Sequence, residues 1–311
     1  MKFILLVLLY FLILEAKEPI SPIPLEVDYD LKKALLGKKL FFDAMLSRDY
    51  SVSCFSCHDI NEHGGADPRK VSIGFKHHKG NIQSPTVLNA RYNFVQFWNG
   101  RAKDLLEQAN GPLTNPNEHN MDKKTIEMRI NNSSFYKKEF KKVYHVSYIY
   151  YKLVLKAIVE FEKALTTPNS RFDKYLRGEI KLTDSEEKGY KLFKHYGCIT
   201  CHNGINIGSN SYQKMGTFID YDTKSNYPDR SVVTKKEFDK NVFKVPTLRN
   251  ITQTAPYFHD ASATTLKEAI NSMSQHNLGM IISDKDADYI ISFLKSLDGE
   301  KPKILEINEA F

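Results

Sequence analysis

The sequence predicts a mainly α-helical protein made of two domains in tandem with long loops. Its 311 residues exceed the size of a typical single domain and suit two cores of ordinary size. The two halves repeat one another around a short cysteine motif. Apolar residues mostly follow helical spacing, while glycine, proline and asparagine separate these stretches and few segments alternate as strands do.

A helix is expected before each cysteine motif. The pattern Cys-x-x-Cys-His occupies residues 54–58 in the first half and 198–202 in the second. It is preceded by the related segments 37–41 (Gly-Lys-Lys-Leu-Phe) and 189–193 (Gly-Tyr-Lys-Leu-Phe). The same order of elements in both halves indicates two copies of one structural unit.

The repeat continues downstream of the motifs. Pro85-Thr86 and Asn99 recur at equal spacing as Pro246-Thr247 and Asp260. Further on, Leu105 and Glu107 match Leu266 and Glu268, so the repeat covers a whole domain-sized unit.

A turn-rich stretch separates the two units. Residues 150–165 have apolar side chains at helical spacing and are followed by Thr-Thr-Pro-Asn-Ser at 166–170, which ends the helix. We therefore predict an N-terminal domain at 17–167 and a C-terminal domain at 168–311.

Two helices of the second half are indicated by their ends. Thr183 and Glu186 form a capping box at the start of the first. The second is predicted to begin near Ser283 and to stop at Gly299. Its apolar face carries Ile290, Phe293, Leu294 and Leu297.

The first 16 residues are predicted to form a secretory signal peptide. Met1-Lys2 is followed by an apolar stretch at 3–14 that is short for a bilayer span. An uncleaved N-terminal anchor is the alternative, because Leu14 is an imperfect residue before a cut after Ala16. The net charge of +7 comes from lysines scattered along the chain, and no basic run interleaved with aromatics indicates nucleic-acid binding.

The cysteine motifs carry the strongest chemical signal. All four cysteines lie in them, so none is left for a disulfide. Cys-x-x-Cys-His is the pattern of c-type haem attachment, in which both thiols add to haem vinyl groups and the histidine ligates the iron. A zinc ribbon needs its cysteine pairs roughly 15 to 20 residues apart, whereas almost half the chain separates these. We predict two cytochrome c-like haem domains, with two covalent haem c groups attached through Cys54, Cys57 and His58 and through Cys198, Cys201 and His202.

The sixth ligands of the two irons are predicted to differ. Met273 follows the segment 265–268 at a place where its thioether would close the coordination of the second haem and raise its potential. The repeat puts Pro112 at the matching position of the first half. The first haem is therefore expected to be open or weakly ligated, and an open iron can bind a small oxidant.

Four motifs resemble signatures of the bacterial diheme cytochrome c peroxidase family. They are 85–89 (Pro-Thr-Val-Leu-Asn), 96–102 (Gln-Phe-Trp-Asn-Gly-Arg-Ala), 246–250 (Pro-Thr-Leu-Arg-Asn) and 254–260 (Thr-Ala-Pro-Tyr-Phe-His-Asp). The resemblance runs from about Leu31 to Leu297. It implies a periplasmic enzyme that reduces hydrogen peroxide to water with electrons from a small c-type cytochrome or similar donor, and that often forms a homodimer. The N-terminal domain would be peroxidatic and the C-terminal domain would transfer electrons.

The same resemblance assigns three side chains to the reaction. Gln108 and Glu118 match a distal glutamine and glutamate at the first haem. Cleavage of the O–O bond needs a proton moved between the two oxygens, which a carboxylate can carry while an amide holds the peroxide. Trp98, the only tryptophan, matches a residue on the electron route between the haems.

The family also implies a calcium ion between the domains. Backbone carbonyls at positions matching Thr254 and Pro256 hold it, together with an asparagine side chain where this chain has Gln83. His259, opposite Trp98 in the repeat, is expected to have a structural hydrogen-bonding role rather than to ligate iron.

Two further positions depart from the family pattern. Many members cap the resting first haem with a histidine where this chain has Phe75, so either His77 or His78 takes over or the haem is permanently open. The open form is the favoured prediction, with His63 and His119 as weaker candidate ligands. Asn99 replaces an aspartate that usually follows the tryptophan.

Two other functions remain open at this level. One is a diheme oxidase of a protein substrate, like the enzyme that matures the tryptophan cofactor of methylamine dehydrogenase; that enzyme has tyrosine in place of Met273. The other is a plain electron-transfer cytochrome, in which both irons would be six-coordinate.

Overall fold

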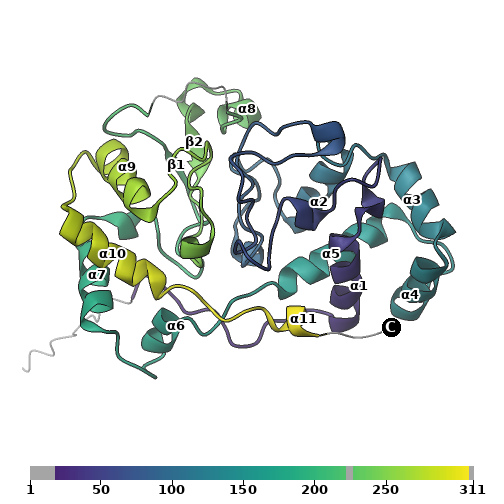
Figure 1. The fold of residues 1–311 in the computed structure, drawn as a ribbon, viewed down its shortest axis with the longest axis horizontal. Helices are drawn as coiled ribbons and strands as arrows, with labels where there is room; N and C mark the ends of the chain where they lie inside the picture. Colours follow the sequence, from purple (N-terminus) through teal and green to yellow (C-terminus); the bar gives the residue numbers. More distant parts are fainter. Residues whose placement is uncertain (1–17, 222–226, 308–311) are drawn as a thin grey trace, which may run out of the picture.

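The computed structural model describes residues 18–221 and 227–307 and is mainly helical, in two lobes that lie side by side (Figure 1). The predicted signal peptide at 1–16 lies outside the described residues. Within the described ranges, no helix combines the length and apolar character that a membrane crossing needs.

The N-terminal lobe contains five α-helices and four short 3-10 helices among its described residues. The α-helices are α1 (Leu31–Phe42), α2 (Leu105–Thr114), α3 (Lys123–Asn132), α4 (Ser134–Tyr144) and α5 (Tyr151–Ala164). The 3-10 helices are η1 (Ala44–Leu46), η2 (Cys54–Ser56), η3 (Phe75–His77) and η4 (Ala90–Tyr92). The predicted helix at 150–165 is α5.

The described part of the chain after α5 contains a two-stranded antiparallel sheet, in which Tyr212 pairs with Lys244. Its strands are β1 (Tyr212–Lys214) and β2 (Val242–Lys244). The helices are α6 (Arg171–Leu176), α7 (Asp184–His195), η5 (Cys198–Thr200), α8 (Ser231–Thr234), η6 (Glu237–Asp239), η7 (Ile251–Gln253), α9 (Leu266–Leu278), α10 (Asp284–Lys295) and α11 (Lys303–Glu306).

The internal repeat is visible in the structure as two equivalent pairs of closely packed helices, one pair in each half of the chain. A Cβ atom added at Gly37 of α1 would lie 1.9 Å from the Ala157 carbonyl oxygen of α5, and one at Gly189 of α7 would lie 1.9 Å from the Tyr289 carbonyl oxygen of α10. Only glycine permits backbones to approach this closely. The repeated Gly of the two segments before the cysteine motifs is therefore explained by packing.

The capping predictions for the second half are confirmed, with one correction. Thr183 and Glu186 form the capping box of α7, and Ser283 is the N-cap of α10. However, α10 ends at Lys295 instead of continuing to Gly299. A Cβ atom at Gly299 would lie 2.0 Å from the Thr167 carbonyl oxygen, so this glycine marks a close chain contact beyond the helix.

The two ends of the described chain pack on opposite lobes. Ile20 belongs to the apolar core built by α7 and α10. At the other end, Ile304 of α11 joins the core of α1 and α5, and Figure 1 shows α11 beside α1. The ammonium group of Lys38 donates hydrogen bonds to the carbonyls of Ile304, Leu305 and Ile307 at 3.0–3.1 Å. These exchanged ends, in which each end of the described chain packs on the opposite lobe, hold the two lobes together.

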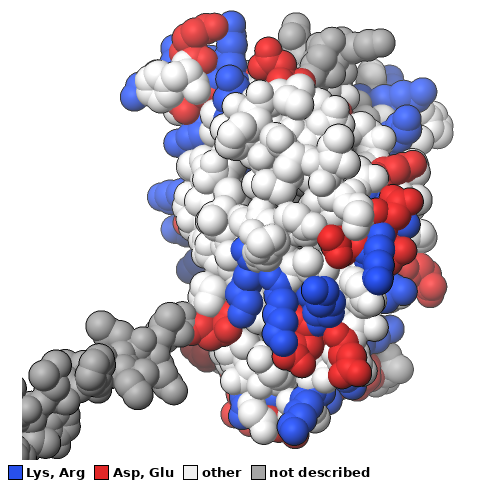
Figure 2. All heavy atoms as spheres, turned by 90° about the vertical axis from the view of Figure 1, so that its left-hand side faces the viewer, with Lys and Arg blue, Asp and Glu red and all other residues white. Residues whose placement is uncertain are grey.

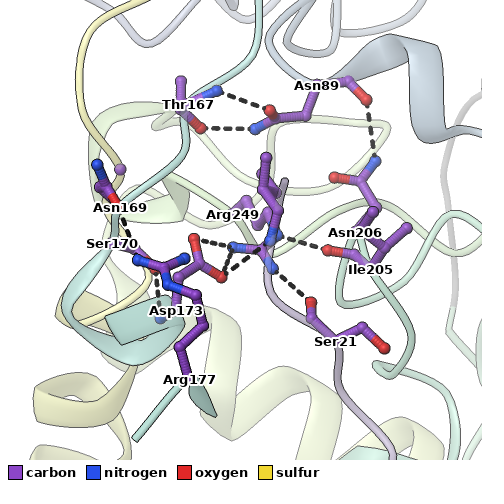
Figure 3. A network of polar contacts seen from close by, with 12 residues as sticks. Ser21, Asn89, Thr167, Asn169, Ser170, Asp173, Arg177, Ile205, Asn206 and Arg249 are labelled. Carbon is purple, nitrogen blue, oxygen red and sulfur yellow. Dashed lines mark hydrogen bonds and ion pairs between the residues drawn. The ribbon is translucent and has the colours of Figure 1, made fainter. Parts of the chain in front are cut away.

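A buried polar network surrounds the segment between α5 and α6 (Figure 3). The side chains of Asn89 and Asn250, which are equivalent in the repeat, both donate to Thr167 Oγ1, at 2.7 and 2.8 Å. Next to them, the Arg249 guanidinium donates to both carboxylate oxygens of Asp173, at 2.9 and 3.1 Å. Both charged side chains are fully buried. The network holds each lobe to the segment that joins them.

Candidate active site

Both cysteine motifs face one cavity of about 650 Å³. Cys54, Cys57 and His58 line one part of it, and Cys198, Cys201 and His202 line another. The four cysteines form no disulfide. Each motif therefore presents two free thiols and a buried imidazole to the same hollow, and this donor set fits a covalently attached haem.

The two motif histidines are suited to binding iron. Nδ1 of His58 donates to the Gly65 carbonyl oxygen at 3.2 Å, which leaves Nε2 with the lone pair that an iron ligand needs. Burial lowers the pKa of His58, and it lowers the pKa of His202 to about 4. Both imidazoles are therefore neutral at pH 7.

The structure places Met273 and Pro112 at matching positions of matching helices. Met273 lies on α9 and Pro112 on α2, and both line the cavity. A thioether is available on the side of the second motif. Proline offers no ligand at the equivalent point near the first.

Gln108 and Glu118 both line the cavity in the N-terminal lobe, together with Pro112. Gln108 lies on α2, and Glu118 lies in the loop that follows. Burial raises the pKa of Glu118, while a 2.5 Å hydrogen bond from Asn115 Nδ2 and the positive charge of Arg101 oppose that shift. A buried carboxyl group with a raised pKa is suited to take up and release a proton during a reaction.

The loop around Phe75 brings no histidine to the cavity. Phe75 is buried, and its backbone N–H donates to the Glu118 carbonyl oxygen at 2.7 Å. His77 and His78 are exposed and do not line the cavity. Nδ1 of His78 donates to the Phe75 carbonyl oxygen at 2.7 Å, which holds this ring on its own loop.

The two weaker candidates, His63 and His119, are placed very differently. His63 is paired with Asp59 at 2.8 Å, outside the cavity. His119 is buried and lines the cavity, with Nδ1 donating to the Leu46 carbonyl oxygen at 2.9 Å. Of the four histidines considered as further ligands of the first haem, His63, His77, His78 and His119, only His119 lines the cavity.

Trp98 connects the two halves. Its indole N–H donates to the Gln83 carbonyl oxygen at 2.8 Å, and its own carbonyl accepts from the Lys244 backbone N–H at 2.7 Å. The ring is buried in a cluster of C-terminal side chains that includes Phe243, with Met273 packed against it. The predicted electron-route residue thus lies between the two motifs.

The residues predicted to hold calcium line the same cavity. Gln83 donates from Nε2 to the Asp67 carbonyl oxygen at 3.4 Å. Gln83 also donates from its backbone to the His259 carbonyl oxygen at 2.9 Å. The His259 ring itself stacks on Phe243, with a ring separation of 4.1 Å.

Three cavity residues were not assigned a role from the sequence. Arg101 stands in a family motif, but its influence on Glu118 depends on a loop that the sequence does not place. Glu162 is buried among the apolar residues of α5, and burial raises its pKa to about 8. Lys244 is buried, and a lysine gives no sequence signal for burial.

The fold and the cavity define a c-type cytochrome with two haem-attachment motifs. Residues 31–181 match the family model described as di-haem cytochrome c peroxidase, and residues 186–298 match the model described as cytochrome c. This chain belongs to the di-haem cytochrome c peroxidase family and carries two covalently bound c-type haems. The family resemblance found in the sequence is confirmed.

Relatives of known name support this assignment. The chain is 45% identical over 291 residues to cytochrome c551 peroxidase of Nitrosomonas europaea, covering 93% of this chain and 87% of that protein. It is 40% identical over 275 residues to cytochrome c551 peroxidase of Pseudomonas aeruginosa, covering 86% and 79%. It is 42% identical over 290 residues to the cytochrome c peroxidase Ccp of Escherichia coli, covering 91% of this chain and 61% of that longer protein.

Solved structures share the fold. A MauG-like protein associated with microbial copper homeostasis superposes with a TM-score of 0.79 at 27% identity, covering 93% of this chain and 95% of that one. The diheme peroxidase BthA of Burkholderia thailandensis superposes with a TM-score of 0.70 at 20% identity, covering 91% and 89%. The second likeness concerns the fold alone.

Proposed function

We propose that this protein reduces hydrogen peroxide to water with electrons from a small c-type cytochrome or a similar donor. The observation that carries the proposal is the first-motif side of the cavity, where Pro112 offers no ligand and Gln108 and Glu118 line the wall. The peroxidases among its relatives support the same activity. In this account residues 17–167 form the peroxidatic domain and 168–311 the electron-transfer domain.

Cys54, Cys57 and His58 would hold the first haem, which when bound would supply an iron able to accept oxidising equivalents from peroxide. The protein's part is to position the peroxide and to move a proton. Glu118 would take a proton from one oxygen of the peroxide and return it to the other, and its raised pKa suits both steps. The Gln108 amide holds the peroxide by hydrogen bonds.

His202 and Met273 would hold the iron of the second haem, which would receive electrons from the donor, and Trp98 would lie on the route to the first haem. An apolar patch offers the donor a docking place. Phe218 and Ile281 are 68% and 93% exposed, Ile219 and Met280 are exposed beside them, and Phe218 packs on Gly279 at the end of α9. The C-terminal lobe turns a broad face with few charges to the viewer, bordered by basic and acidic groups (Figure 2).

Three further features belong to this proposal. The protein acts in the periplasm, where a c-type cytochrome donor is found. It binds a calcium ion through the carbonyls of Thr254 and Pro256, with Gln83 as the side-chain ligand. It forms a homodimer, as the family resemblance implies.

Steady-state turnover tests the function. A reduced c-type cytochrome should be oxidised only when hydrogen peroxide is added, with two donor molecules oxidised for each peroxide removed. Dependence on a protein substrate, with no oxidation of small donors, would favour the oxidase function. No consumption of peroxide with any donor would favour the plain electron-transfer cytochrome.

Replacing Arg101 should move the pH profile of this reaction. The positive charge of Arg101 stabilises the Glu118 carboxylate, so Arg101→Gln raises the pKa of Glu118 further. Because the reaction needs the carboxylate, the acid limb of kcat/KM for peroxide moves to higher pH. Arg101→Lys keeps the charge and is the control, with a limb close to that of the wild type. An acid limb of kcat/KM at the same pH in the wild type and both variants would exclude this electrostatic coupling between Arg101 and Glu118.

A further inference from the structure

Lys244 is a buried lysine without a partner. Its side chain is 5% exposed, and within the described ranges its ammonium group makes no hydrogen bond or ion pair. Burial lowers the pKa of Lys244 to about 8, and no nearby charge opposes this shift. Burying a charge is costly unless an anion pairs with it. The environment of Lys244 is therefore incomplete without a further anionic group.

The position of Lys244 indicates where that anion lies. Lys244 is the last residue of β2, lines the cavity, and donates its backbone N–H to the Trp98 carbonyl oxygen. Pro246, two residues on, contributes a backbone carbonyl beside the His202 ring. Lys244 is thus on the side of the second motif, and its backbone is hydrogen-bonded to the tryptophan that contacts both halves.

The remaining charges of the cavity wall do not supply the anion. The described acidic residues that line it are Glu118 and Glu162, both in the N-terminal lobe, and neither influences the pKa of Lys244. The other lysines and arginines that line it, Lys79, Arg101 and Lys214, are exposed to solvent. Lys244 is therefore the one fully buried cation in the described wall of a cavity that receives two haems.

We propose that Lys244 binds a propionate carboxylate of the second haem, the one attached at Cys198 and Cys201. A haem carries two such carboxylates, and one enclosed in this cavity needs a cation as much as Lys244 needs an anion. The ion pair places a positive charge beside the second haem. It offsets the negative charge of the propionate and thereby favours the reduced, less positive form of that iron.

The test is a redox titration of the holoprotein, followed by the absorption bands of each haem. In Lys244→Gln the propionate loses its cation, so the second haem becomes harder to reduce. At a fixed potential its reduced-to-oxidised ratio should fall about tenfold, which is a shift of about 59 mV for one electron. Lys244→Arg should stay within about threefold of the wild type.

Lys214→Gln is the matched control. Lys214 lies on the paired strand β1 and also lines the cavity, but it is exposed, so its loss should change the ratio by less than about twofold. A ratio in Lys244→Gln within twofold of the wild type, or an equal change in Lys214→Gln, would overturn the proposal.

A second measurement decides the matter if Lys244→Gln does not yield folded protein. A crystal structure of the wild-type holoprotein should place Lys244 Nζ about 3 Å from a propionate oxygen, and an ammonium group turned to water or backbone would overturn the proposal. Both measurements depend on haem occupancy and not on peroxidase activity. A wild-type protein that does not turn over peroxide would reject the proposed function and leave this result intact.

Discussion

Glu118→Gln is expected to lower kcat/KM for hydrogen peroxide by about 10²–10⁴-fold, the usual contribution of a positioned acid–base group. The amide keeps the shape of the side chain and can still bond to Asn115, whose Nδ2 donates to the carboxylate at 2.5 Å. What it loses is the ability to carry a proton from one peroxide oxygen to the other. Peroxide binding and the haem absorption spectra should change little.

Glu107→Gln is the control for this result. Glu107 lies on α2, one residue before Gln108, and its exposed carboxylate accepts a hydrogen bond from the Lys103 backbone. Its loss should leave kcat/KM within about twofold of the wild type, since it does not line the cavity. A fall of similar size in both variants would show that Glu118 acts through local structure instead of proton transfer.

The second large effect concerns stability. Arg249→Met should lower the free energy of unfolding by about 3–5 kcal/mol, because it leaves the Asp173 carboxylate buried without its cation. Arg249 also donates to the carbonyls of Ile205 and Ser21, at 2.6 and 3.0 Å. One side chain thus links α6, the N-terminal end of the described chain and the loop after the second motif (Figure 3).

Urea denaturation of the holoprotein measures this loss. Arg171→Gln removes one partner of the Arg171–Glu186 pair, in which the arginine side chain is 50% exposed, and should cost only about 0–1 kcal/mol. The double variant Arg249→Met/Asp173→Asn should recover part of the loss, since no unpaired charge remains. Equal losses in Arg249→Met and Arg171→Gln would contradict the account.

Much of the fold follows from local sequence signals. The capping box of Thr183 and Glu186 and the apolar spacing of 150–165 predict α7 and α5, because both depend on residues close in the chain. The repeated Gly37 and Gly189 indicate two copies of one unit. The exchanged ends were not predictable, because the apolar side chains of Ile20 and Ile304 can be buried on either lobe.

The site divides in a similar way. The cysteine motifs could be recognised from spacing, since covalent haem attachment requires those residue types in that order. The matching positions of Met273 and Pro112 could be predicted from the internal repeat. Lys244 and the influence of Arg101 on Glu118 depend on which loops meet across the cavity, and no local pattern encodes such a meeting. The cavity-facing His119 was only a weak candidate for the same reason.

The central claim is that the first haem presents an open iron to peroxide. Electron paramagnetic resonance of the fully oxidised protein, followed at once by mixing with hydrogen peroxide, tests it most directly. The account predicts a high-spin signal from the first haem and direct reaction of the oxidised form. Two low-spin haems that react only after one-electron reduction would contradict it, and recovery of the high-spin signal in a His119, His77 or His78 variant would then identify the ligand.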